Sequence, residues 1–390
     1  MTSTAYAPSL PLWGAVLAMS LGIFGIVGAE LLPASLLTSM AHDLQVTEGM
    51  AGQAVTVTAG VAVLASLLVA AASGRVDRRN VLIFLTSLLV VSNLLVAVAP
   101  SLNLLLLARM MLGISLGGFW ALSAATMMRL VPEKDIAKAL AILFGGVSAA
   151  TVFAAPLGSL LGDLWGWRAV FVAAAGLGAL ALLAQLVLLP SMHSEQAARL
   201  STVFRLLRRP GLGLGMLAFL LVFTGHFGFF TYLRPFLETV TRAGPMGVTS
   251  ILLIFGIGTF VGNSVSSRLI ERSMFGTLAT MPLLLAVLAI LLATLGGNAF
   301  ADAALPAIWG FAFGIIPVSW STWVTRVAPD EAESGGGLLV ATANLAITIG
   351  AAAGGWIFDH NGSRMVFFAC AAVLALSFVS TLMLKARPSR

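Results

Sequence analysis

The sequence predicts an all-α membrane protein with twelve transmembrane helices arranged as two related six-helix halves. Three observations support this prediction: a very low content of charged residues, twelve long apolar runs and an internal repeat. Hydrophobic residues make up 59% of the 390-residue chain, and charged residues only 9%. Because soluble domains carry about 25% charged residues, water could not solvate this chain as a globule.

The same composition excludes several classes of protein, namely soluble enzymes, nucleic-acid-binding domains and disordered chains. The formal net charge of +6 is typical of a membrane protein with basic cytoplasmic loops, so we expect no nucleic-acid partner. The one cysteine, Cys370, lies in an apolar run. This position excludes a disulfide framework and a cysteine-based metal site.

Twelve apolar runs are long enough to cross a membrane, which takes about 20 residues per helix. They predict helices near 12–40, 50–72, 80–99, 104–130, 137–161, 168–189, 212–236, 248–268, 277–296, 303–326, 337–358 and 365–385.

The longest polar break, from Pro190 to Pro210, separates the first six runs from the last six. We therefore expect an N-terminal bundle over 1–190, a cytoplasmic linker over 191–211 and a C-terminal bundle over 212–390. Sixteen Lys and Arg residues fall on the side of this linker, against four on the other side. The positive-inside rule then places both termini in the cytoplasm.

The two halves repeat each other in sequence. The segment from Asp163 to Arg168 is matched by the segment from Asp359 to Arg364, at an offset of 196, and a second match has an offset of 197. A parallel repeat of six helices predicts a pseudo-twofold axis along the membrane normal and a binding site between the halves at mid-depth. The alternative is that arginines and prolines simply recur in the loops of any polytopic protein.

Local motifs resemble those of the major facilitator superfamily. Gly74, Asp77 and Arg78 lie in a stretch similar to the family's cytoplasmic motif between helices 2 and 3, though shortened. The stretch 105–117, which contains Arg109, resembles the helix 4 motif with its buried arginine. The resemblance implies a transporter with two pseudo-symmetric bundles that is active as a monomer.

A third motif bears on the mode of transport. Gly145, Pro156 and Gly158 resemble the family's antiporter motif. The match is degraded, because Ala155 precedes the proline and the paired glycines are displaced. This departure weakens the implication of antiport without removing it.

Within the superfamily, the segment from Glu30 to Pro33 resembles the glutamate-containing motif of the drug:proton antiporter branch, which includes drug and sugar exporters. Further segments are similar to bacterial purine ribonucleoside efflux pumps, namely 51–58, 117–123, 204–210 and 229–235. The resemblance implies a multi-pass protein of the bacterial inner membrane that exports purine ribonucleosides. A multidrug or sugar exporter is the alternative.

Two charged residues, Glu30 and Arg109, are predicted to lie deep in the bilayer, where a charge costs about 2.5–3.5 kcal/mol. A carboxyl group in a medium of low dielectric can hold and release a proton near neutral pH, so Glu30 is the expected proton carrier. Its alternative role is a permanently protonated group that bonds a neighbouring helix. Arg109 keeps its proton at any accessible pH. We expect it to act as a fixed charge near a carboxylate or as a structural partner of backbone carbonyls.

Candidate substrate ligands are polar or aromatic residues on the helices that line the cavity in the resembling family. His226 could bond a base or ribose or could titrate, and its alternative is a neutral histidine bonded to one backbone carbonyl. Trp120 and Trp320 could stack a purine, a contact worth about 1–3 kcal/mol. Most aromatic residues in membrane helices instead pack or anchor at interfaces, and we expect Trp309 and Trp323, near helix ends, to be anchors. The other candidate ligands are Gln53, Asn263 and Asn344.

The cytoplasmic motif and the energy source complete the prediction. Asp77 and Arg78 are expected to clamp the cytoplasmic side through a salt bridge or a helix-dipole contact, unless the motif is an orientation signal alone.

The run 335–337 lacks the Lys and Ser/Thr of a phosphate loop, and the histidines are dispersed. We therefore expect no enzyme activity, no metal and no cofactor besides the proton as coupling ion.

Overall fold

A computed structural model of the chain describes residues 11–72, 76–192, 209 and 211–386. In these ranges, twelve helices are long and apolar enough to cross a membrane. They are α1 (Trp13–Leu44), α2 (Glu48–Ala72), α3 (Arg78–Val98), α4 (Leu102–Leu130), α5 (Ile136–Trp165), α6 (Trp167–Leu188), α8 (Leu212–Thr239), α9 (Pro245–Arg272), α10 (Met274–Leu295), α11 (Ala299–Val327), α12 (Ala332–Asn361) and α13 (Ser363–Ala386), with short 3₁₀ turns at Glu133–Asp135 and Pro329–Glu331.

The predicted fold class is confirmed, but several helices extend beyond the predicted apolar runs. Polar residues cap the ends of these helices outside the apolar stretch. The side chain of Asn298 accepts hydrogen bonds from the backbone N–H groups of Phe300 and Ala301 at the start of α11. Ser273 caps α10 in the same way. Because such caps satisfy the free N–H groups of a helix end, a helix can begin before its apolar run does.

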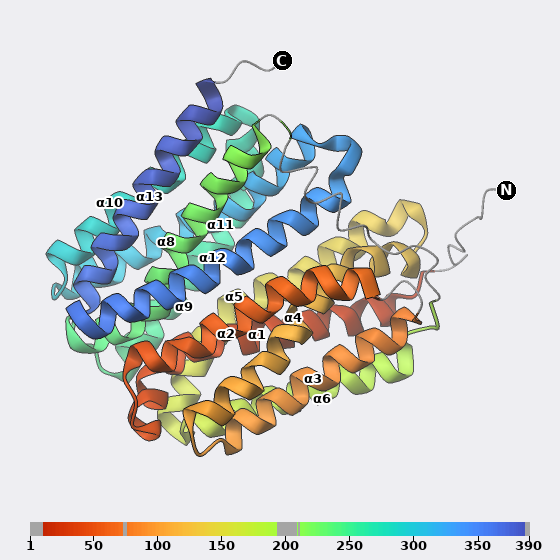
Figure 1. Cartoon of the computed structure of the whole chain (residues 1–390), viewed down its shortest axis with the longest axis horizontal. Helices are drawn as coiled ribbons and strands as arrows, with labels where there is room; N and C mark the ends of the chain where they lie inside the picture. Colours follow the sequence, from red (N-terminus) through yellow and green to blue (C-terminus); the bar gives the residue numbers. More distant parts are fainter. Residues whose placement is uncertain (1–10, 73–75, 193–208, 210, 387–390) are drawn as a thin grey trace.

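The helices pack as two groups of six, α1–α6 and α8–α13 (Figure 1). In the first group α1 packs on α5 and α6, and α2 packs on α4. In the second group α8 packs on α12 and α13, and α9 packs on α11. Most of the predicted linker, 191–211, lies outside the described residues, so its placement between the groups stays a prediction.

Glycines bring α4 into close contact with α2. A Cβ added to Gly113 would lie closer than 3.0 Å to the backbone oxygen of Thr58. A Cβ added to Gly117 would be as close to the backbone oxygen of Ala62. Only residues without a side chain allow two helix backbones to approach this closely, and such glycines are common where membrane helices cross.

The same crossing recurs between α11 and α9. Gly310 faces the backbone oxygen of Phe255, and Gly314 faces that of Thr259. A Cβ added to either glycine would again lie closer than 3.0 Å to the oxygen that it faces. Each of these four residues follows its counterpart on α4 or α2 by 197 positions. The repeat predicted from loop motifs therefore extends into the packing of the helices.

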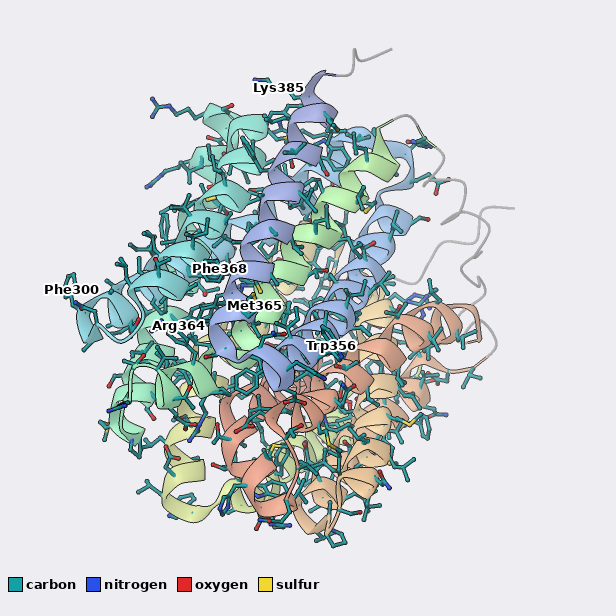
Figure 2. The ribbon with its side chains drawn as sticks, turned by 60° about the vertical axis from the view of Figure 1, so that its left-hand side comes forward. Phe300, Trp356, Arg364, Met365, Phe368 and Lys385 are labelled. Carbon is teal, nitrogen blue, oxygen red and sulfur yellow. The ribbon has the colours of Figure 1, made fainter. Side chains whose placement is uncertain are left out.

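Two loop arginines also make equivalent contacts. Arg168 donates from Nη2 to the backbone oxygen of Ala99 at 2.9 Å, and Arg364 donates from Nη2 to that of Gly296 at 3.0 Å. Figure 2 shows Arg364 where α12 turns into α13. In each half the arginine that opens the sixth helix therefore binds the end of the third, which supports the pseudo-twofold relation.

The two bundles meet along one half of their length and diverge along the other (Figure 1). Contacts between α2 and α12 run from Gly49 beside Asp359 to Gly60 beside Thr348, and α5 meets α9 where Val152 faces Gly256. The closed end is the end at which α1 is followed by α2. The open end is the one at which α1 begins and α13 ends, and the positive-inside rule predicts that this end faces the cytoplasm.

The outer surface of the bundles is apolar. Phe300, Trp356, Met365 and Phe368 project from it (Figure 2). Phe300 is 83% exposed and Trp356 is 64% exposed, which would be costly in water. Lipid is the solvent that suits such a surface.

The glycine crossing between α9 and α11 gives a first testable prediction. Changing Gly314 to Val should force the two backbones apart and cost about 1–3 kcal/mol of stability. The melting temperature of the purified protein in detergent measures this loss. Gly176 on α6 is the matched control, because a Cβ added there meets no atom within 4 Å. Equal melting temperatures for Gly314→Val and Gly176→Val would contradict the prediction.

Candidate functional site

Arg109 is fully buried in the N-terminal bundle and binds α1 and α2 through oxygen atoms. Its Nη1 donates to the backbone oxygen of Ala29 at 2.9 Å, and Nη2 donates to that of Glu30 at 3.5 Å. Its Nε donates to the Thr58 hydroxyl at 2.9 Å and to the backbone oxygen of Ala54 at 3.3 Å. The guanidinium group therefore joins three helices of one bundle.

The position of Arg109 follows from the proline in the Glu30–Pro33 motif. Pro33 lies inside α1 and has no backbone N–H, so the carbonyl of Ala29 lacks its usual helical donor. A buried carbonyl without a donor is costly, and Arg109 supplies the missing hydrogen bond. The motif on α1 and the arginine on α4 thus form one structural unit.

Glu30 is half-buried and follows Ala29 directly in α1. Among the described residues, no carboxylate oxygen comes within 4.0 Å of the Arg109 guanidinium, so the two side chains do not form a salt bridge. The contact between them is through the backbone of Glu30, as the structural alternative for Arg109 predicted. The role of Glu30 as a proton carrier stays a prediction.

His226 lies in the C-terminal bundle, is only 3% exposed and is surrounded by aromatic rings. Its ring stacks on that of Phe313, and the indole N–H of Trp309 donates to its Nδ1 at 3.0 Å. An Nδ1 that accepts a hydrogen bond carries no proton, which places the ring hydrogen of a neutral imidazole on Nε2. The partner is thus an indole rather than the backbone carbonyl that the structural alternative named.

The prediction that Trp309 and Trp323 anchor at a membrane interface is wrong, because both side chains are buried. The Trp309 side chain is fully buried and stacks on Phe229 with 3.8 Å between ring centroids. Position near the end of an apolar run suggested an anchor, but α11 begins at Ala299. The longer helix places Trp309 in the interior of the bundle, opposite His226.

The predicted substrate ligands are distributed over both bundles. Gln53, Trp120 and Asn263 are half-buried. Asn344 is 5% exposed and donates from Nδ2 to the backbone oxygen of Val340 in its own helix. Within the described part of the chain, no hydrogen bond or ring contact joins any two of the six candidates.

The two tryptophans proposed to stack a purine have different environments. Trp120 lies 6.2 Å from Phe144, measured between ring centroids, on the N-terminal bundle. Trp320 is 1% exposed and packs against Phe219 and Trp323. Trp120 is therefore the more accessible of the two rings in this conformation.

The cytoplasmic motif organises the start of α3. The carboxylate of Asp77 accepts hydrogen bonds at 2.9 Å from the backbone N–H groups of Arg79 and Met192, and the Ser191 hydroxyl also donates to it. The backbone N–H of Arg78 donates to the carbonyl of Met192 at 3.0 Å. Asp77 thus caps α3 and joins it to the chain that follows α6. Gly74, the third predicted gate residue, lies outside the described residues.

The antiporter motif lies on α5, where two helices approach closely. A Cβ added to Gly158 would lie 2.7 Å from Leu32 and Ser35 of α1. Pro156 is buried and removes the helical donor of the Val152 carbonyl, which faces the other bundle. Gly145 has open space beside it. The motif therefore lies between α1 and the contact of α5 with α9.

Two further charged side chains, Arg234 and Asp302, are buried inside the protein. The Arg234 side chain is only 4% exposed, and Asp302 is fully buried. Asp302 accepts hydrogen bonds from the Thr241 hydroxyl at 2.7 Å and from the backbone N–H of Gly297 at 2.8 Å. Asp302 lies in the first turn of α11 and Arg234 lies near the end of α8, within the predicted helix 212–236, so their burial by the protein is what the sequence did not show.

Comparison with known proteins places this architecture in a family. The family model described as Major Facilitator Superfamily matches residues 12–340. The chain belongs to the major facilitator superfamily. Its fold is confirmed by a bacterial homologue of the human lysosomal transporter Spinster in an inward-facing, unoccupied conformation. That structure has a TM-score of 0.77, is 17% identical and is matched over 98% of its length and 97% of this chain.

Two relatives match nearly the whole length of this superfamily member. The purine ribonucleoside efflux pump NepI of Shigella sonnei is 45% identical over 386 residues, which cover 99% of this chain and 98% of that protein. The transcription regulatory protein OpdE of Pseudomonas aeruginosa is 44% identical over 375 residues, or 95% of this chain and 93% of that protein. The chain is a multi-pass membrane transporter with an alternating-access fold, and not an enzyme.

The unit formed by Pro33 and Arg109 gives a second testable prediction. Changing Arg109 to Lys should cost about 1–3 kcal/mol of stability, because a single ammonium group cannot reach all of these oxygens and leaves the Ala29 carbonyl without a donor. Changing Pro33 to Ala restores a backbone N–H for that carbonyl. The cost of Arg109→Lys should therefore be smaller in the Pro33→Ala background.

A double-mutant cycle on melting temperatures measures this coupling. The four proteins are the parent, the two single variants and the double variant. Equal costs of Arg109→Lys in both backgrounds would show that Pro33 and Arg109 act independently.

Proposed function

We propose that this transporter exports purine ribonucleosides in exchange for protons and that it does so as a monomer in the bacterial inner membrane. The observation that carries the substrate class is the 45% identity to the purine ribonucleoside efflux pump NepI over 99% of this chain. Likeness over the full length includes both bundles, between which substrates of this fold bind. Beyond the proton, the proposal needs no cofactor.

The arrangement around Glu30 supports the proton as coupling ion. Arg109 binds the backbone oxygens of Ala29 and Glu30. Within the part of the chain that the structure describes, it forms no salt bridge with the Glu30 carboxylate. The carboxyl group is thus positioned by its helix and remains able to change its protonation state. Charge within a membrane is expensive, which favours a functional reason for a half-buried glutamate.

The proposed cycle combines this carboxyl group with the rocking of the two bundles. In the conformation described, the bundles are closed at the end predicted to face the periplasm and diverge at the other (Figure 1). Nucleoside enters from the open end as Glu30 releases its proton. After the bundles rock, Glu30 binds a proton from the periplasm and the nucleoside leaves. A proton that enters down the membrane potential releases about 2.3 kcal/mol per 100 mV, which is enough to drive a neutral solute uphill.

The coupling role of Glu30 gives a third testable prediction. In inside-out vesicles, the Glu30→Gln variant should lose roughly tenfold or more of its proton-driven nucleoside uptake, because an amide cannot carry a proton between the two sides. Exchange of labelled for unlabelled nucleoside needs no net proton movement and should persist. Glu271→Gln is the matched control, since Glu271 is exposed at the end of α9. Proton-driven uptake by Glu30→Gln at the parent rate would remove Glu30 from the mechanism.

The substrate class is tested separately by competition. Uptake of labelled inosine should be inhibited by unlabelled guanosine and left unchanged by arabinose or a cationic dye. Inhibition by the dye or by arabinose, with none by guanosine, would instead support the multidrug or sugar exporter. The two experiments are independent. If the transported solute is not a purine ribonucleoside, the role of Glu30 can still be measured on the flux of whichever solute is transported.

A further inference from the structure

Two aspartates that occupy equivalent positions in the repeat both reach across the closed end of the bundles. Asp163 lies near the end of α5, and Asp359 lies near the end of α12, 196 positions later. Each belongs to a conspicuous sequence match between the halves. In each case the carboxylate binds a group on the opposite bundle rather than on its own.

Asp163 binds a buried arginine of the C-terminal bundle. The Nη2 of Arg234 on α8 donates to Asp163 Oδ1 at 2.8 Å, and these side chains are 4% and 17% exposed. The Nη1 of Arg234 also donates to the Ser35 carbonyl of α1 and, at 3.1 Å, to the Ser159 hydroxyl of α5. Arg234 is thus a cation of one bundle whose acceptors, apart from Glu238 on its own helix, lie on the other.

Asp359 binds the start of α2 in the N-terminal bundle. Its Oδ1 accepts a hydrogen bond from the backbone N–H of Gly49 at 2.9 Å, and its Oδ2 accepts one from the Thr47 hydroxyl at 2.7 Å. The approach requires a glycine, because a Cβ at position 49 would lie closer than 3.0 Å to this carboxylate. A carboxylate at a helix N-terminus is also favoured by the helix dipole.

We propose that Asp163 and Asp359 are paired latches that hold this end of the transporter closed, with Arg234 as the partner of Asp163. Opening this end moves α5 away from α8 and α2 away from α12, so both sets of hydrogen bonds must break. Their loss therefore shifts the population toward the conformation that is open at this end. The inference concerns closure alone and holds for any substrate or coupling ion.

The two latches differ in strength. The Asp163–Arg234 contact is an ion pair between largely buried groups, and removing Asp163 leaves this cation with the Glu238 carboxylate of its own helix but without a charged partner on the opposite bundle among the described residues. Asp359 is exposed and binds neutral donors, so it contributes less. We therefore expect the Asp163 latch to have the larger effect on the balance between conformations.

A third carboxylate at the same end provides a matched control. Asp43 on α1 binds Arg168 and, at 3.1 Å, the indole N–H of Trp167 on α6. All three residues belong to the N-terminal bundle. Asp43→Asn therefore removes the same charge from the same end without changing any contact between the bundles.

The experiment measures distances between spin labels in the full-length protein, and it gives a fourth testable prediction. The single cysteine, Cys370, is first changed to Ser. Labels at Val98 and Phe300 then report on the closed end, and labels at Met128 and Val327 report on the open end. In each pair the first residue lies on the N-terminal bundle and the second on the C-terminal bundle, and all four side chains are exposed. Asp163→Asn should raise the ratio of long to short Val98–Phe300 distances roughly tenfold or more, the effect of one lost hydrogen bond to a charge.

Asp359→Asn should shift the same distances in the same direction by less, and Met128–Val327 distances should shorten in both variants. Unchanged distances in both variants, or an equal shift in Asp43→Asn, would overturn the proposal. If Asp163→Asn does not fold, Asp359→Asn decides the question alone, because Asp359 is exposed and its replacement leaves the bundle interior intact.

Discussion

Two guanidinium groups that cannot lose their charge set much of the arrangement of this transporter. A charge inside a membrane protein must find acceptors, and the available acceptors are backbone carbonyls and a few polar side chains. Arg109 finds them within the N-terminal bundle, on α1 and α2. Arg234 finds most of its acceptors on the opposite bundle. The first arginine therefore stabilises one bundle, and the second stabilises one conformation of the pair.

The two bundles share a scaffold but not their chemistry. The glycine crossings on α4 and α11 correspond at an offset of 197, as do the carbonyls that they face. At the same offset, however, Arg109 of α4 corresponds to Pro306 of α11. In the N-terminal bundle an arginine bonds α1, whereas in the C-terminal bundle Trp309 bonds the histidine of α8. Contacts between the first and fourth helices thus use a cation in one bundle and aromatic rings in the other.

The sequence predicted the fold well, because each transmembrane helix needs only its own apolar run to be recognised and the repeat relates the halves. It predicted the site less well. The burial of Arg234 could not be predicted, because the order of residues in one helix does not show which side of that helix faces another bundle. Trp309 was taken for an anchor because the start of α11 lies outside its apolar run. The link between Pro33 and Arg109 could not be predicted at all, since it depends on which carbonyl lies opposite which side chain once three helices have packed.

Helix α1 connects the proposed coupling group with the proposed latch. Arg109 holds α1 at Ala29 and Glu30, and Arg234 holds it from the other bundle at Ser35. Between these points lies Pro33, where the helix lacks one backbone hydrogen bond and depends on Arg109 for a substitute. A change of charge at Glu30 acts on the segment of α1 that the latch also holds. The proposed coupling group and the proposed latch are therefore separated by only about one and a half turns of a single helix, at 3.6 residues per turn.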